Sequence, residues 1–208
     1  MTRGTASFTV RPMRETDLDE TARILWEGFR EDPVWGPAFP EHPERAAHAI
    51  AHWRFMADQA VRRGEPLVAE LPDGSLGAVS TWFPPGEDEI AAEDLGAYEQ
   101  LLRSTIGDVA AEALLGEGDM FAEARPTAPH AYLSLLAVSP AARGLGIGMR
   151  LVAAALERYD AVGLQTYLES SNPANDARYE RLGYVRAKQV NIPGSPTVQT
   201  YLRQPAAG

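Results

Sequence analysis

A run of three glycines behind an arginine contains the residue types best suited to chemistry: Arg143-Gly144-Leu145-Gly146-Ile147-Gly148. Glycine has no side chain, so a ligand can approach its backbone N–H groups closely. Where such a loop begins a helix, the unpaired N–H groups and the helix dipole both favour an anion. Arg143 adds a fixed positive charge. The pattern therefore predicts a site for a phosphate or pyrophosphate group.

An apolar strand and an amphipathic helix flank the glycines and would position them. Residues 131–138 form an apolar run about the length of one strand. Ser139-Pro140 ends this run, because proline has no N–H to donate to a sheet. Residues 149–159 are predicted to be helical, since apolar side chains recur every fourth position from Ile147. The expected order is strand, glycine loop, helix.

Three kinds of nucleotide-binding loop can be compared with this pattern. A triphosphate-binding P-loop is disfavoured, because Gly-Lys-Ser/Thr is absent after the glycines. A dinucleotide-binding loop could use Glu169 as its acidic residue, but it needs a glycine where Met149 stands and a tighter turn after Val138. The third candidate is an acyl-CoA loop, Gln/Arg-x-x-Gly-x-Gly/Ala, which is matched at each defined position by Arg143, Gly146 and Gly148. By itself this short match is equally compatible with a plain glycine-rich turn.

A second strand and helix follow the first pair. Residues 164–169 are predicted to form the strand. Asn172 is suited to cap a helix, and Pro173 suits its first position. The helix is expected over 174–182, ending at Gly183.

This second helix carries a motif of its own. Asn172 is followed seven positions later by Tyr179, and Gly183-Tyr184 comes after it. The two motifs, in this order and at this distance, resemble the signatures of the GNAT acyltransferases. The resemblance covers roughly the C-terminal third of the chain, and its general look is similar to the puromycin N-acetyltransferase-like branch.

The resemblance implies an α/β fold of the GNAT type, with residues 1–208 as a single acyltransferase domain. Its mixed, mostly antiparallel sheet of about seven strands would be flanked by helices and splayed between the fourth and fifth strands. The sequence pattern predicts further strands and helices that agree with this order. The expected strands are 7–11, 66–71, 77–83, 184–191 and 197–203, and the expected helices are 18–29, 44–63 and one or more within 87–120.

The resemblance also implies acetyl-CoA as co-substrate and assigns residues to it. The backbone of the first strand would pair with the pantetheine arm, through Leu136, Ala137 and Val138. Amides of the loop would bind the pyrophosphate, namely those of Arg143, Gly144, Leu145, Gly146, Ile147 and Gly148. Asn172 and Asn175 would reach the pantetheine from the other side, and the Leu136 N–H would stabilise the oxyanion.

Tyr179 and Glu169 are the candidate catalytic residues. The resemblance places Tyr179 beside the sulfur, where it would donate a proton to the departing thiolate. An attacking amine must lose a proton, so a general base is needed. Tyr132 and Ser134 occupy the positions where some GNAT proteins carry a base, yet neither is a base at neutral pH. Glu169 is the nearest carboxylate in the sequence and ranks above His130.

Composition limits the remaining possibilities. The chain has 208 residues, a net charge of −10 and no cysteine. It therefore lacks disulfides and cysteine-bound zinc, and a cytoplasmic protein is expected. The negative charge argues against nucleic acid as a partner and is compatible with a cationic amine. No apolar run is long enough to span a membrane, and either a monomer or a homodimer is expected.

Two local patterns leave alternatives open. His48 and His52 lie one helical turn apart, a spacing that could bind a metal. No third ligand is apparent, so exposed histidines and no metal are expected. The proline-rich loop at 31–43 either covers a hydrophobic edge or forms part of the acceptor pocket. Thr16 and Asp19 are expected to form a capping box for the first helix.

The sequence thus predicts an acetyl-CoA-dependent N-acetyltransferase that transfers the acetyl group directly to the amine of a small molecule. An O- or longer-chain acyltransferase is one alternative. A catalytically idle acyl-CoA-binding module is another, and it is disfavoured by the presence of Tyr179.

Overall fold

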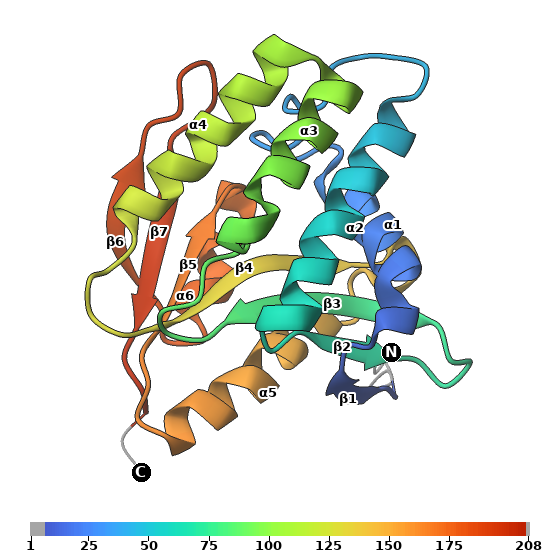
Figure 1. Ribbon diagram of the computed structural model, residues 1–208. Helices are drawn as coiled ribbons and strands as arrows, with labels where there is room; N and C mark the ends of the chain where they lie inside the picture. Colours follow the sequence, from blue (N-terminus) through green and yellow to red (C-terminus); the bar gives the residue numbers. More distant parts are fainter. Residues whose placement is uncertain (1–6, 207–208) are drawn as a thin grey trace.

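A seven-stranded sheet runs through the computed structural model, which describes residues 7–206 (Figure 1). The strands lie in the order β1-β2-β3-β4-β5-β7-β6. Only the β4–β5 pair is parallel, and every other neighbouring pair is antiparallel. Their bounds are β1 Thr9–Pro12, β2 Leu67–Glu70, β3 Leu76–Phe83, β4 Ala131–Val138, β5 Thr166–Ser170, β6 Val185–Val190 and β7 Val198–Arg203. The mixed, mostly antiparallel sheet predicted from the sequence is confirmed.

Helices cover both faces of this sheet. Their bounds are α1 Leu18–Phe29, α2 Arg45–Arg63, α3 Leu95–Ile106, α4 Asp108–Ala124, α5 Ile147–Ala161 and α6 Asp176–Glu180. The first four lie on one face and α5 lies on the other (Figure 1). Two large apolar clusters match this division, since one joins α1 to α4 with the sheet and the other joins α5 to it. No helix of residues 7–206 is long and apolar enough to cross a membrane.

The strands β4 and β5 diverge after a short paired segment. Their parallel register covers only Ala131–Leu133 against Thr166–Leu168. β4 continues along β3 to Val138, so its far half has no neighbour on the β5 side. A sheet edge therefore opens within the sheet, and the predicted splay between the fourth and fifth strands is confirmed.

A bulge in β4 lies at the point of divergence. Thr81 pairs with Leu135 and Trp82 pairs with Leu133, so Ser134 has no partner on β3. The Thr81 hydroxyl accepts a hydrogen bond from the Leu135 N–H at 3.0 Å. Because side chains alternate between the faces of a strand, one extra residue shifts the alternation. Beyond the bulge, Leu135 and Ala137 belong to the cluster under α1 to α4.

Three local predictions were wrong in detail. The strand expected from 164 begins at Thr166, and the helix expected over 174–182 is a 3₁₀ turn at Pro173–Asn175 followed by α6, which ends at Glu180. The capping box of Thr16 with Asp19 is not formed. Instead the Asp17 carboxylate accepts the Arg14 N–H at 2.8 Å and pairs with Arg11, because a buried carboxylate needs such partners.

Candidate active site

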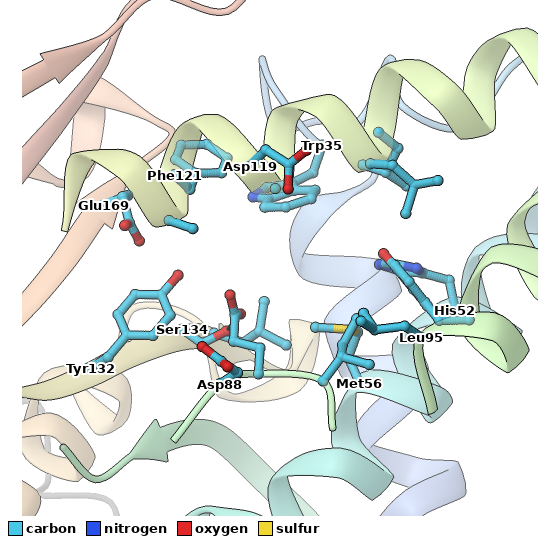
Figure 2. A pocket seen from close by; sticks show the side chains of 18 of the residues that line it. Trp35, His52, Met56, Asp88, Leu95, Asp119, Phe121, Tyr132, Ser134 and Glu169 are labelled. Atoms are coloured by element: carbon cyan, nitrogen blue, oxygen red, sulfur yellow. Dashed lines mark hydrogen bonds between the residues drawn. The ribbon is translucent and has the colours of Figure 1, made fainter. Parts of the chain in front are cut away.

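A cavity of about 280 Å³ lies beside the divergence of β4 and β5, under helices α2 to α4 (Figure 2). Its walls are mostly aromatic and aliphatic, and several titratable groups are set among them. The lining includes the side chains of Trp35, His52, Trp53, Met56, Asp88, Glu89, Tyr98, Leu114, Asp119, Phe121, Arg125, Tyr132, Ser134, Leu135, Glu169 and Ser171. The helices predicted within 87–120 contribute a large part of this wall.

The proline-rich loop at 31–43 both covers a hydrophobic edge and lines the cavity. Val34 and Phe39 are buried, so the loop covers an apolar edge. Trp35 lines the cavity. The carboxylate of Asp32 holds the loop in place, because it accepts the N–H groups of Val34 and Trp35 at 2.9 and 3.2 Å and the Ser171 hydroxyl at 2.7 Å. This contact ties the loop to the residue that follows β5.

The bulge in β4 brings three nearly consecutive side chains to the cavity. Tyr132, Ser134 and Leu135 all line it. In a regular strand, Leu135 would face the opposite side from Ser134. Tyr132 and Ser134, the two positions where some GNAT proteins carry a general base, are therefore part of the cavity wall. Burial raises the pKa of Tyr132 well above its ordinary value of 10, so its phenol stays protonated at neutral pH.

A charged cluster that the sequence did not reveal surrounds these residues. Glu89 accepts hydrogen bonds from the Arg125 guanidinium and the Ser134 hydroxyl. The Arg125 guanidinium carbon lies 3.9 Å from the centre of the Tyr132 ring, a cation–π contact. Glu89 is 36 residues from Arg125 and 45 from Ser134 in the chain, so no local spacing could have indicated the cluster.

Glu169, the predicted general base, lies in this cluster at the end of β5. Burial raises the pKa of its carboxyl from 4.5 to about 7, because loss of water disfavours the charged form. The nearby Arg125 cation opposes this shift and Glu89 adds to it. Its Oε1 atom is buried and forms no hydrogen bond with a residue of the described chain. A carboxyl that lines a cavity and titrates near neutral pH can accept a proton.

His52 does not behave as predicted. Its side chain is only 2% exposed and lines the cavity, so the expectation of an exposed histidine was wrong. The helical spacing predicted an exposed side chain, but α3 and the proline-rich loop cover this face of α2. His52 therefore packs against Phe39, Trp53 and Tyr98. Burial lowers its pKa from 6.5 to about 3, so the ring is neutral at neutral pH.

The glycine loop has the backbone geometry expected of an anion site. Gly144 and Gly146 have φ angles of +80° and +73°, which favour glycine, and Gly146 precedes the first residue of α5. A Cβ on Gly148 would lie 2.7 Å from a methyl group of Val138, so glycine allows α5 to pack on β4. No backbone carbonyl of residues 7–206 outside the helix accepts the N–H of Gly146, Ile147 or Gly148. These donors point from a helix N-terminus, as predicted.

The open edge of β4 presents further backbone groups. Ser139 N–H donates to the Gly77 carbonyl at 2.9 Å, and hydrogen-bonded pairs alternate along an antiparallel ladder. The N–H and C=O groups of Leu136 and Val138 therefore point away from β3, to the side that β5 leaves. Ala137 takes part in the ladder, and its side chain is buried. Of the three predicted strand residues, two present their polar backbone atoms to the gap.

The polar residues assigned to the co-substrate have partners within the chain. The Arg143 guanidinium donates to the backbone carbonyl of Glu27 at the end of α1. The Asn172 side chain accepts the Ala174 N–H at 3.0 Å, which confirms its predicted capping role. The Asn175 side-chain Oδ1 accepts a hydrogen bond from the Arg178 guanidinium at 2.7 Å. All three lie at the ends of helical segments.

Tyr179 is buried on α6 and does not line the cavity. Its ring packs edge-on against Tyr184 and beside Tyr201, each with ring centres 6.2 Å apart. Burial raises the pKa of Tyr179 from 10 to about 12, so it carries a proton at neutral pH. The structure thus brings Glu169 into the cavity and leaves Tyr179 in a separate aromatic cluster. His130 also lies outside the cavity, with Nδ1 2.9 Å from the Ala128 carbonyl.

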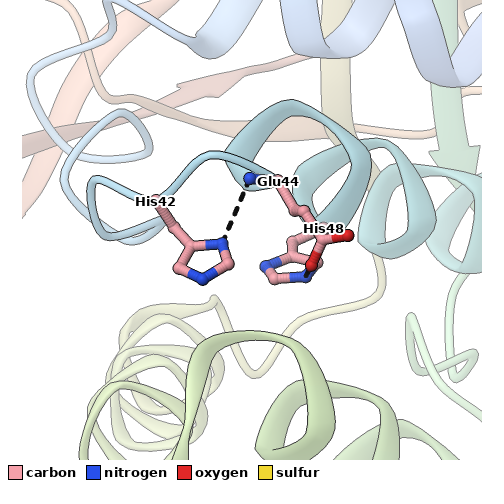
Figure 3. Close-up of side chains that lie close together, drawn as sticks. All are labelled: His42, Glu44 and His48. Carbon is pink, nitrogen blue, oxygen red and sulfur yellow. Dashed lines mark hydrogen bonds and ion pairs between the residues drawn. The ribbon is translucent and has the colours of Figure 1, made fainter.

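A group of potential metal ligands lies on the surface at the start of α2 (Figure 3). One ligand atom each of His42, Glu44 and His48 lies within 4.8 Å of the others. The prediction that no third potential ligand lies near His48 was therefore wrong. Nδ1 of His42 accepts the Glu44 N–H at 3.1 Å. In the neutral ring the proton must then occupy Nε2, which leaves no free lone pair for a metal in this conformation.

Comparison with known proteins identifies the family. Residues 19–184 match the acetyltransferase (GNAT) family, and the chain belongs to it. Among solved structures, one described as histone acetyltransferase HPA2 and related acetyltransferase from Corynebacterium glutamicum is 24% identical, with a TM-score of 0.76 over 97% of this chain and 98% of that one.

Two further structures share the fold at lower identity. Arylalkylamine N-acetyltransferase 2 from Aedes aegypti has a TM-score of 0.66 at 11% identity, over 96% of this chain and all (100%) of that one. A phosphinothricin acetyltransferase from Sinorhizobium meliloti, solved with AcCoA, has a TM-score of 0.53 at 18% identity, over 97% and 90% of the two chains. At these identities the likeness concerns the fold alone.

Proposed function

We propose that this GNAT protein is an acetyl-CoA-dependent N-acetyltransferase, which transfers an acetyl group directly to the amine of a small molecule. The observation that carries the proposal is the position of Glu169. Its carboxyl has a pKa of about 7 and lies where the cavity meets the open edge of β4. At this junction the open edge of β4 presents backbone N–H donors, and the cavity encloses space for an acceptor.

The residues at the open edge fit the co-substrate that the family uses. The outward N–H and C=O groups of Leu136 and Val138 suit the amides of a pantetheine arm. The N–H groups of Gly144 to Gly148 suit its pyrophosphate, with Arg143 beside them. Asn172 and Asn175 would border the arm from the α6 side. Acetyl-CoA supplies the activated acetyl group as a thioester.

The chain's own residues would handle the protons and charge of the transfer. Ionised Glu169 takes one proton from the acceptor ammonium, and the free amine nitrogen then bonds to the acetyl carbon. The Leu136 N–H donates to the thioester oxygen, where negative charge develops. The carbon–sulfur bond breaks, Tyr179 donates its proton to the departing thiolate, and the excess proton on the new amide nitrogen restores the Tyr179 phenol. No acyl-enzyme is required.

The acceptor and setting are proposed on more general grounds. Asp88 and Asp119 are exposed at the cavity and would attract a cationic amine (Figure 2). Residues 1–208 would act as one domain, as a monomer or homodimer, in the cytoplasm. The puromycin N-acetyltransferase-like branch remains the proposed placement within the family, on the look of the C-terminal third.

An acceptor screen tests the proposal. The protein is incubated with acetyl-CoA and a panel of small amines and alcohols, while released thiol and acetylated product are measured together. Equal amounts of thiol and N-acetylated amine are expected. Exclusive acetylation of alcohols, or transfer only from longer acyl-CoA donors, would replace the proposal by the corresponding acyltransferase.

A binding measurement separates an enzyme from an idle binding module. Acetyl-CoA at a hundredfold excess over its dissociation constant should stabilise the protein by about 2.7 kcal/mol, and NAD and ATP should do far less. Stabilisation without any transfer to the panel would leave an acyl-CoA-binding module. Greater stabilisation by NAD would support the dinucleotide-binding interpretation.

A further inference from the structure

The end of the cavity away from Glu169 contains buried polar groups without partners. Nδ1 of His52 and Nε1 of Trp53 are inaccessible to solvent and form no hydrogen bond with any residue of 7–206. Tyr98 also lines the cavity, and its ring packs beside that of His52. Because Nδ1 of His52 and Nε1 of Trp53 are closed off, a ligand in the cavity would reach the His52 ring through Nε2, which is not among the buried atoms that lack a partner.

These groups are held rigidly by one another. The His52 ring lies edge-on to Trp53, with centres 4.6 Å apart, and its centre is 5.7 Å from that of Tyr98. Phe55 stacks on Tyr98 at 5.3 Å. Rings packed in this way can turn little, so they are preorganised for a partner. In Figure 2, His52 lies on one side of the cavity, and Tyr132 and Glu169 lie on the other.

The charge at the two ends differs. Neutral His52 offers one N–H donor and one acceptor nitrogen, and protonated Tyr98 offers a hydroxyl. A hydroxyl can donate to one of these groups and accept from the other, whereas an ammonium can only donate and is attracted more strongly by carboxylates. The carboxylates that would attract a cation are Asp88, Asp119, Glu89 and Glu169. The His52 end therefore suits a neutral hydroxyl.

Apolar side chains also line the cavity, among them Trp35, Met56, Leu114 and Phe121. Such a wall favours an aromatic or aliphatic body over a charged one, because burial of apolar surface contributes about 25 cal/mol per Å². A volume of about 280 Å³ restricts this body to a small molecule.

We propose that the acceptor is an amine whose apolar body carries a hydroxyl at the opposite end, and that His52 and Tyr98 bind this hydroxyl. The amine lies at Glu169 and the hydroxyl at His52. The assignment of the amine end rests on the proposed acetyl transfer. The assignment of the hydroxyl end concerns binding and can be tested without turnover.

Calorimetric titration with matched amines tests the hydroxyl end. The probes are 2-phenylethylamine and its 3-hydroxy and 4-hydroxy derivatives, titrated into the full chain with saturating coenzyme A. At least one hydroxylated probe should bind about tenfold more tightly than the parent amine, the value of one or two net hydrogen bonds. Equal affinities for all three, or no binding of any, would overturn the proposal.

Variants assign the preference to named groups. His52→Phe and Tyr98→Phe should each bring the affinity ratio close to one, and circular dichroism checks that they fold. Tyr98→Phe removes only a hydroxyl, so it decides the matter if His52→Phe does not fold. The matched control is His48→Gln, one turn along α2 and outside the cavity, which should retain the tenfold ratio. A ratio unchanged in both cavity variants would contradict the assignment.

The same titration distinguishes this inference from the proposed function. If a hydroxylated amine binds preferentially but no amine is acetylated, the enzyme assignment fails and the hydroxyl site stands. If amines are acetylated equally well with and without a hydroxyl, the enzyme assignment stands and the inference fails.

Discussion

Along residues 136–148 the groups suited to a ligand are backbone atoms, whereas in the neighbouring cavity they are side chains from separate segments. The first region is one strand edge and one helix N-terminus, joined by a short loop. The second combines Glu89, Arg125, Ser134 and Glu169 with aromatic rings from α2, α3 and α4. A backbone site depends on local conformation, and a side-chain site depends on tertiary packing. Substitutions in the two regions should therefore fail in different ways.

The largest effect is expected in the backbone region, from Gly146→Asp. It places a carboxylate where the N–H groups face an anion, at a φ of +73°. Coenzyme A affinity should fall by at least about 100-fold, or roughly 3 kcal/mol. The control Gly163→Asp carries similar strain at the other end of α5, where φ is +68°. Calorimetry that finds normal binding by Gly146→Asp would move the pyrophosphate site elsewhere.

A smaller effect is expected for Tyr179→Phe, which removes one hydroxyl and keeps the ring. If Tyr179 protonates the thiolate, turnover should fall by roughly 100-fold, while the KM of the acceptor changes little. Tyr201→Phe is the matched control, since its ring packs beside Tyr179. Steady-state kinetics are measured under conditions where chemistry limits the rate. Wild-type turnover in Tyr179→Phe would show that Tyr179 only packs against its neighbours.

In the side-chain region, Glu169→Gln should change how stability depends on pH. The folded carboxyl has a pKa of about 7 against 4.5 in its ordinary state, so the folded protein binds the proton more tightly than the unfolded chain. Stability is therefore lost as the pH rises from about 4.5 to 7. Glutamine does not ionise, so the variant should gain on the order of 2 kcal/mol at pH 8 relative to pH 5. Urea unfolding curves with the same pH dependence in both proteins would contradict this.

The smallest effect is expected for Arg125→Gln. The Arg125 cation lowers the pKa of Glu169, so its removal should shift the rising limb of the pH–rate profile upward by about one unit. Arg103→Gln, which removes an exposed cation on α3, should leave the limb in place. If the rising limb of Arg125→Gln lies at the same pH as that of the wild type, the pKa of Glu169 does not depend on the Arg125 cation.

The contrast between the regions explains how much the sequence could predict. The strand, glycine loop and helix were predictable because glycine, proline and apolar spacing act over a few residues, and the splay followed from the family resemblance. The bulge at Ser134 could not be predicted, since it depends on pairing with Thr81 and Trp82 some 50 residues earlier. Burial of His52 likewise depends on α3 and the proline-rich loop. Glu169 was found only because it ends a recognisable strand.

The pH dependence of kcat/KM for wild type and Glu169→Gln tests the central claim most directly. The acceptor is an amine whose own pKa lies well above 9, so that only the enzyme titrates near neutrality. Wild type should show a rising limb with an apparent pKa near 7. Glu169→Gln should lose this limb and be roughly 100-fold slower at pH 8. A glutamine variant that keeps the limb and the rate would show that Glu169 is not the base.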